Sequence, residues 1–207
     1  MTARRAERVD VRRRDLIAAA GALLTGVALG GCSQGGAAAA EQARAGDRKG
    51  YVSGDGTIEQ IPAESRAAAV QLSGTTLEGQ PWSNAALTGT VLVVNVWGSW
   101  CPPCITEAPE LQAAWEQIQG RKLAVQFIGL DKMETPETGL AFQARHKITY
   151  PSLAYEGGVA ILALQGKAVA TPTTLVLDRL GRIAARVSGP VTAKILTGLV
   201  DDALAQS

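Results

Sequence analysis

Residues 93–104 read Val-Val-Asn-Val-Trp-Gly-Ser-Trp-Cys-Pro-Pro-Cys and join two elements of different kinds. The run Val91–Val96 is apolar and β-branched almost throughout, which is typical of a strand buried on both faces of a sheet. Residues 102–119 carry apolar side chains at helical spacing and end at a glycine. The sequence therefore predicts a buried strand and then a helix, with Cys101 and Cys104 at the junction.

Strand-like and helical segments alternate around this junction. Short runs between residues 70 and 82 are split by turn residues and indicate a hairpin. Further strands are expected at 123–130, 151–155, 173–177 and 182–187, and further helices at 135–146, 159–165 and 191–205. This order predicts an α/β domain with a central mixed β-sheet flanked by helices and an added N-terminal hairpin.

Composition limits the classes of partner. The chain has 207 residues and is 46% hydrophobic, which suits one domain of ordinary size with extra segments. Six arginines precede residue 15, whereas from residue 32 onward 14 basic residues face 16 acidic ones. Because no basic face remains beyond the N-terminus, nucleic acid is not expected as a partner.

The N-terminus is typical of an export signal. Residues 1–15 are rich in arginine, and residues 16–30 form an uncharged run of mostly Ala, Leu and Gly. A helix of that length, at about 1.5 Å per residue, falls short of the roughly 30 Å hydrocarbon core of a membrane. The charged start, short apolar run and small residues at the end instead predict a signal peptide over residues 1–31.

Residues 29–32, Leu-Gly-Gly-Cys, resemble the lipobox of bacterial lipoproteins. That resemblance implies that Cys32 carries a lipid, becomes the mature N-terminus and anchors the protein on the extracytoplasmic face of the cell membrane. A plain signal peptide with a spare cysteine and a short membrane anchor are the alternatives. Three is an odd number of cysteines, so in a secreted protein one would be left without a disulfide partner. Lipidation of Cys32 leaves Cys101 and Cys104 as a pair. Arg13-Arg14 loosely resembles a twin-arginine export signal.

Residues 32–66 contain few bulky side chains and many Gly, Ala and charged residues, so we expect a flexible tether. In the alternative, Tyr51, Val52 and Ile58 dock on the domain. The domain itself is predicted to span residues 67–207.

The Cys-x-x-Cys spacing suits three kinds of site. Zinc needs about four ligands, and beyond Cys32 the chain offers only Cys101, Cys104 and His146, so no metal site is expected. A purely structural disulfide would close a very small loop and constrain the unfolded chain little. A redox pair is favoured because a helix N-terminus lowers the pKa of a thiol placed there. We expect Cys101 to be the more exposed and acidic thiol, with the Cys104 N–H pointing back at its sulfur.

Residues 93–104 resemble the active-site strand and loop of the thioredoxin superfamily, and most closely its extracytoplasmic TlpA/ResA branch. Pro109 matches the proline within that superfamily's active-site helix. Residues 170–174 resemble its cis-proline loop, and residues 179–182 match the hairpin that follows. The resemblance covers roughly residues 67–205. It implies a thioredoxin-like fold and thiol–disulfide oxidoreductase activity that needs no bound cofactor.

The resemblance also implies site residues. Cys101 and Cys104 would form the redox disulfide. The Thr171–Pro172 bond would be cis, and its loop would offer backbone groups to a substrate strand. The substrate-binding residues implied are Trp100, Pro102, Pro103, Thr171 and Pro172.

One position departs from thioredoxin itself. Thioredoxins carry a buried Asp where this chain has Asn95, which cannot titrate. The TlpA/ResA branch has a Glu three residues after its second cysteine, and Glu107 matches it. The resemblance implies that Glu107 takes the Cys104 proton. In the alternative, Glu107 lies on a solvated helix face.

Two directions of exchange are open. A reductase would receive electrons from a membrane thiol donor and reduce exported protein disulfides, and the resemblance implies apocytochrome c as a typical substrate. A disulfide-introducing oxidase on the same fold is the alternative, and Pro102-Pro103 does not decide between them. We favour the reductase. A copper-binding assembly module is disfavoured, because such carriers resemble Cys-x-x-x-Cys with a distant His.

We predict that Cys32→Ala abolishes lipid attachment and leaves the protein unprocessed or released. Labelling of producing cells with a radioactive fatty acid tests this. Continued labelling of the variant would rule out the lipobox.

Overall fold

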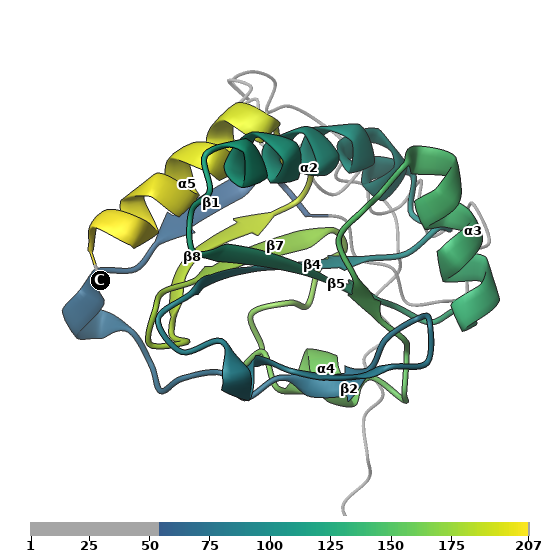
Figure 1. Ribbon diagram of the computed structural model, residues 1–207, viewed down its shortest axis with the longest axis horizontal. Coiled ribbons are helices and arrows are strands. Elements are labelled where there is room, and N and C mark those ends of the chain that lie inside the picture. The colour runs from purple at the N-terminus through teal and green to yellow at the C-terminus, as the bar shows by residue number, and fades with distance from the viewer. Residues whose placement is uncertain (1–53, 207) are drawn as a thin grey trace, which may run out of the picture.

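The predicted buried strand lies at the centre of a six-stranded sheet in a computed structural model, which describes residues 54–206 (Figure 1). The strands, in spatial order, are β1 (Thr57–Gln60), β8 (Ile183–Ser188), β7 (Thr173–Leu177), β4 (Val91–Trp97), β5 (Val125–Asp131) and β6 (Ser152–Leu153). Strands β4, β5 and β6 run parallel, whereas β7 is antiparallel to β4, β8 to β7, and β1 to β8. The mixed sheet predicted from the sequence is confirmed.

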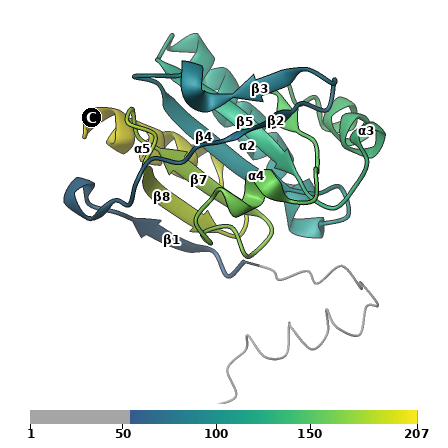
Figure 2. The same ribbon diagram turned by 90° about the horizontal axis from the view of Figure 1, so that it is seen from below.

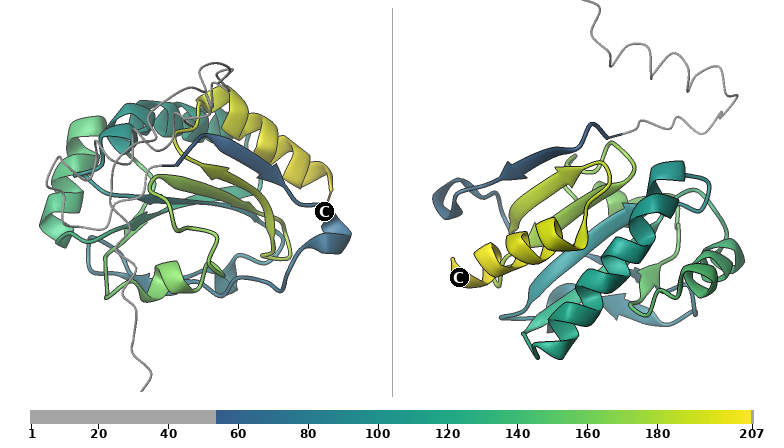
Figure 3. Two further views of the ribbon diagram at one scale, coloured as in Figure 1. Left: turned by 180° about the vertical axis from the view of Figure 1, so that it is seen from behind. Right: turned by 90° about the horizontal axis from the view of Figure 1, so that it is seen from above.

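Helices and a small hairpin cover the sheet. The elements are β2 (Ser73–Thr75), β3 (Pro81–Ser83), α2 (Pro102–Gly120), α3 (Pro136–His146), α4 (Val159–Leu162) and α5 (Ala193–Ala205), with short 3-10 turns at Ala63–Ser65 and Asn84–Ala86. Helices α2 and α5 pack side by side over one face (Figures 1 and 3). The β2–β3 hairpin and α4 lie on the opposite side of the sheet (Figures 1 and 2). The predicted N-terminal hairpin is thereby confirmed.

Alternate residues of β4 enter two different cores. Val91 and Val93 join the cluster formed with α2 and α5. Leu92, Val94 and Val96 join the cluster on the side of the β2–β3 hairpin. Because side chains alternate across a strand, burial on both faces explains the nearly continuous apolar run, which only Asn95 interrupts.

The folded domain begins earlier than predicted. Residues Thr57–Gln60, assigned above to the tether of residues 32–66, pair with β8 and form an edge of the main sheet. Arg66, the last residue of that predicted tether, is buried and donates to Asp178 at 2.9 Å. Backbone pairing and this ion pair hold a segment that has little apolar surface to bury. The predicted signal peptide, Cys32 and the rest of the tether lie outside the described residues.

Most other elements agree with their predicted bounds within a few residues. The exception is the helix expected over residues 159–165, which ends at Leu162. Gln165 and Gly166 shortly after it adopt left-handed backbone conformations, which an α-helix cannot contain. Within residues 54–206, every helix is too short or too polar to cross a membrane.

Removing one partner of the buried Arg66–Asp178 ion pair should cost far more stability than removing one partner of an exposed pair. Both side chains are 1% exposed, and the Asp178 carboxylate also accepts from Arg182. Arg66→Met should lower the free energy of unfolding by about 3 kcal/mol, because a buried carboxylate loses a partner. Arg121→Met, which breaks an exposed pair with Asp201, should cost less than about 1 kcal/mol. Urea unfolding of both variants measures the difference, and equal losses would contradict this ranking.

Candidate redox site

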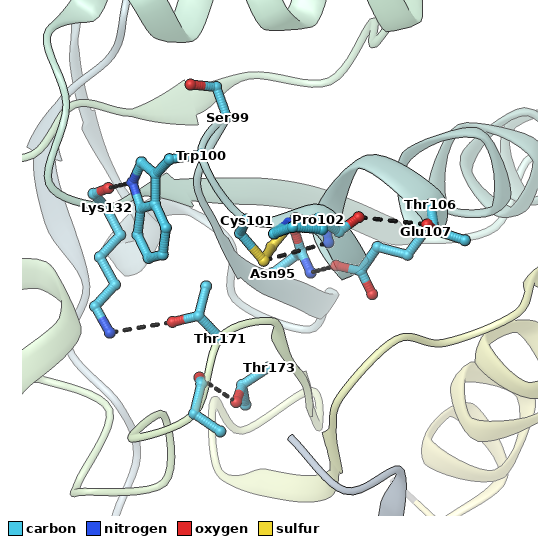
Figure 4. The surroundings of a disulfide bond; sticks show 12 residues. Asn95, Ser99, Trp100, Cys101, Pro102, Thr106, Glu107, Lys132, Thr171 and Thr173 are labelled. Carbon is cyan, nitrogen blue, oxygen red and sulfur yellow. Dashed lines mark hydrogen bonds between the residues drawn. A yellow bond between two sulfur atoms is a disulfide. The ribbon is translucent and has the colours of Figure 1, made fainter. Parts of the chain in front are cut away.

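Cys101 and Cys104 form a disulfide at the start of α2 (Figure 4). Cys101 is the N-cap residue, and the Cys104 N–H donates to Cys101 Sγ at 3.3 Å, as the sequence predicted. Pro102 and Pro103 occupy the first turn, where an N–H group would have no partner within the helix. The Cys101 sulfur therefore lies at the positive end of the helix dipole, where a thiolate is stabilised.

Both cysteines are buried, with exposed fractions of 0% for Cys101 and 1% for Cys104. The prediction that Cys101 would be the more exposed of the two is therefore wrong for the disulfide form. The pair packs in an apolar cluster with Trp97 and Phe142, and the partly buried Trp100 adds to it. The hydrogen bond from the helix, rather than exposure, distinguishes the Cys101 sulfur.

The loop before Cys101 is held by residues that follow β5. Trp100 Nε1 donates to the Lys132 carbonyl at 2.8 Å, and the Ser99 N–H donates to Glu134 Oε1 at 2.8 Å. The Ser99 hydroxyl also donates to Glu134. A Cβ atom at Gly98 would lie 2.6 Å from Trp100 Nε1, so only glycine allows the indole to fold back over this loop. These bonds hold residues 98–100 in place beside the disulfide.

Sequence reasoning missed Lys132 and Glu134. A signal was present, because charged residues directly follow the apolar run of β5. Strands β4 and β5 are parallel, and the carboxyl ends of parallel strands meet at one edge of a sheet. Side chains just beyond β5 therefore lie near the loop just beyond β4.

The proline loop lies beside the same edge. The Thr171–Pro172 bond is cis, as predicted. Strand β7 begins directly after Pro172, and its first residue, Thr173, pairs with Val96 of β4. The proline loop therefore lies next to the loop that joins β4 to Cys101. Thr171 is fully buried, and its Oγ1 accepts from Lys132 Nζ at 3.1 Å (Figure 4).

Glu107 is 2% exposed, so the alternative of a solvated helix face is wrong. Its Oε1 accepts from Asn95 Nδ2 at 2.9 Å, and its Oε2 accepts from the Val191 N–H at 3.2 Å. Asn95 also donates to Thr174 at 3.0 Å. Since Glu107 follows Cys104 by three residues in α2, both side chains lie on one side of the helix.

Burial raises the pKa of Glu107 from 4.5 to about 8, against the lowering effect of the bonds from Asn95 and Val191. A free cysteine thiol has a pKa of about 8.5. A carboxyl group and a thiol with similar pKa values can exchange a proton with little driving force in either direction. The environment of Glu107 therefore suits proton transfer with a neighbouring thiol.

Within residues 54–206, no three His, Cys, Asp or Glu side chains gather where they could hold a metal ion. The His146 ring instead packs on Phe142 with centroids 4.4 Å apart.

The sequence of the chain matches known proteins. Residues 65–186 match the AhpC/TSA family. The thiol:disulfide interchange protein HelX of Rhodobacter capsulatus is 32% identical over 144 residues, which are 69% of this chain and 77% of HelX. The thiol-disulfide oxidoreductase ResA of Bacillus thuringiensis is 28% identical over 124 residues, or 60% of this chain and 69% of ResA.

The fold matches solved structures as well. The crystal structure of a DsbF homologue from Corynebacterium diphtheriae superposes with a TM-score of 0.61 at 26% identity. The match covers 73% of this chain and 96% of that one. The sequence match to the family and the superposition on a solved structure both show a thioredoxin-like fold.

Glu107 should make the stability of the oxidised protein depend on pH. The folded protein keeps the Glu107 proton up to about pH 8, whereas the unfolded chain releases it near 4.5. The free energy of unfolding therefore falls as pH rises between these values. Glu107→Gln lacks this titration, so its stability relative to the parent should rise by on the order of 4 kcal/mol across that interval.

Urea unfolding at several pH values measures this difference. Glu78→Gln is the control, because Glu78 is exposed in the turn between β2 and β3, and it should follow the parent at every pH. A Glu107→Gln profile parallel to the parent's would show that the buried carboxyl does not titrate in this range.

Proposed function

We propose how this member of the AhpC/TSA family, a thioredoxin-fold thiol–disulfide oxidoreductase, carries out its reaction. Cys101 and Cys104 are the proposed redox centre. The proposed task is the reduction of exported proteins by a domain tethered to a membrane. The observation that carries the proposal is the disulfide at the N-terminus of α2, with the Cys104 N–H bonded to Cys101 Sγ. That bond gives the two sulfurs different roles.

In the reduced protein, the Cys101 thiolate attacks a substrate disulfide. A mixed disulfide forms between Cys101 and one substrate sulfur, and the other substrate sulfur leaves as a thiolate. Cys104 then attacks Cys101 Sγ, which restores the observed disulfide and releases the second substrate thiolate. Two electrons pass to the substrate, and a membrane thiol donor returns the protein to its dithiol form.

Glu107 is proposed as the acceptor of the Cys104 proton. Cys104 must become a thiolate before it attacks, and the carboxylate three residues later is close enough in the helix to assist. With a pKa of about 8, only a minor fraction of Glu107 is ionised at neutral pH, but that carboxylate is a stronger base than one with the ordinary pKa of 4.5 and is closely matched to a thiol. Asn95 orients the group through a 2.9 Å hydrogen bond without competing for the proton.

Substrate recognition is assigned to the surface around the disulfide. Trp100, Pro102 and Pro103 would flank the reacting sulfurs, and the backbone of Thr171 and Pro172 would pair with an extended peptide. Because both residues are buried in the disulfide form, this pairing requires the loop to shift when a peptide binds. An apocytochrome c with a Cys-x-x-Cys-His segment is the proposed substrate, because such a segment forms a disulfide that must be reduced before haem attachment. Lipidation at Cys32 would keep the domain at the extracytoplasmic face of the membrane, near a membrane thiol donor.

Cys104→Ser should trap partners as mixed disulfides, because serine cannot attack the bond between Cys101 and a substrate. Non-reducing gels of the exported fraction should show bands of higher mass that collapse with dithiothreitol. Cys101→Ser is the matched control and should show none. If both variants trap equally, or neither traps anything, the proposed roles of the two cysteines are wrong.

The trapped proteins also decide the direction of exchange. An apocytochrome or a membrane thiol donor would support the reductase, whereas many different secreted proteins would support the oxidase. Equilibration of the purified protein with glutathione gives an independent answer, since a reductase requires the more negative potential of the two.

A further inference from the structure

Lys132 connects the two loops that flank the disulfide. Its carbonyl accepts from Trp100 Nε1 at 2.8 Å, and its Nζ donates to Thr171 Oγ1 at 3.1 Å (Figure 4). The first bond joins it to the residue before Cys101, and the second joins it to the residue before Pro172. One side chain and its own backbone therefore set the spacing between the two loops.

This arrangement has a cost that an ordinary surface lysine would not bear. The ammonium group is half-buried, and burial lowers the pKa of Lys132. The next residue, Met133, has φ of 61°, a left-handed conformation that is uncommon outside glycine. Strained backbone conformations persist only where the surrounding structure enforces them, and they are concentrated at functional sites.

The side chain of Thr171 depends on its neighbours for its orientation. Thr171 is fully buried, and the loop around it is held by two further hydrogen bonds. Thr173 Oγ1 donates to the Ala170 carbonyl at 2.8 Å, and the Gly189 N–H donates to the Pro172 carbonyl at 2.9 Å. Lys132 supplies a charged donor to the Thr171 hydroxyl, and hydrogen bonds of that kind are stronger than neutral ones.

We propose that Lys132 is a positioning residue for peptide substrates, which holds Thr171 so that the backbone of the cis-proline loop can pair with an extended chain. The proposal rests on the proposed function, because it assumes that exchange takes place at the Cys101–Cys104 pair. It adds that peptide disulfides depend on Lys132, whereas small disulfides without a peptide backbone do not. Lys132 thus acts on recognition rather than on the reacting sulfurs.

The test compares two substrates of the reduced full-length chain in single-turnover reactions followed by tryptophan fluorescence. One is a peptide with an oxidised Cys-x-x-Cys-His segment, and the other is 2,2′-dithiodipyridine, which has no peptide backbone. Lys132→Met should raise the half-saturating peptide concentration about five- to tenfold, as expected for loss of one hydrogen bond whose donor is only half-buried. The plateau rate and the reaction with 2,2′-dithiodipyridine should stay within about twofold.

Two further variants separate positioning from a general structural effect. Lys132→Arg keeps a charged donor and should restore most of the peptide affinity. Thr171→Val removes the acceptor, and the double variant with Lys132→Met should be no weaker for peptide than either single variant, because both remove the same bond. Thermal unfolding of each variant identifies any that fail to fold, and Lys132→Gln replaces Lys132→Met in that case.

The outcomes separate the two proposals. An unchanged half-saturating concentration, or equal losses with both substrates, overturns the role of Lys132. Additive effects of the Lys132 and Thr171 substitutions overturn it as well. If the parent protein fails to react with either substrate, or if Cys101→Ser reacts as fast as the parent, the proposed function itself is overturned.

Discussion

The position of Cys101 follows from the burial of β4. All seven residues of that strand are buried, and its side chains fill the cores on both faces of the sheet. Such a strand cannot slide or turn over without exposing one of these cores to water. The end of β4 is therefore fixed. Helix α2 begins five residues later at Pro102, so Cys101 is its N-cap residue and Cys104 lies in its first turn. The parallel pairing with β5 and the antiparallel pairing with β7 bring the two supporting loops to that same end.

A buried carboxyl group lies behind the disulfide and is tolerated because other elements supply its partners. Asn95 comes from β4 and Val191 from the segment before α5, so three separate parts of the chain meet at Glu107. These bonds satisfy both oxygens yet leave burial as the larger influence on the pKa. A surface carboxylate would stay ionised throughout the neutral range. The packing of α2 against the sheet thus determines the protonation behaviour of a residue whose sequence environment looks like an ordinary helix.

Features that depend on local pattern could be predicted from the sequence, and those that depend on distant partners could not. The nearly continuous apolar run of β4 and the prolines after Cys101 identify the strand–helix junction without further information. By contrast, residues Thr57–Gln60 are mostly polar, and they form a strand only because β8 offers its backbone. The burial of both cysteines depends on Phe142, which lies about forty residues farther along the chain. The bond from Lys132 to Thr171 likewise joins residues that no spacing rule connects.

The strand β1 closes the sheet on the side of β8. It is four residues long, and Glu59 within it bonds Lys167 at 3.1 Å. Short edge strands with charged side chains are poor templates for additional strands, whereas the exposed edge of β8 would present a longer row of free backbone groups. The segment that resembles a linker in sequence therefore satisfies the backbone groups along β8 and leaves a shorter, charged strand at that edge of the sheet.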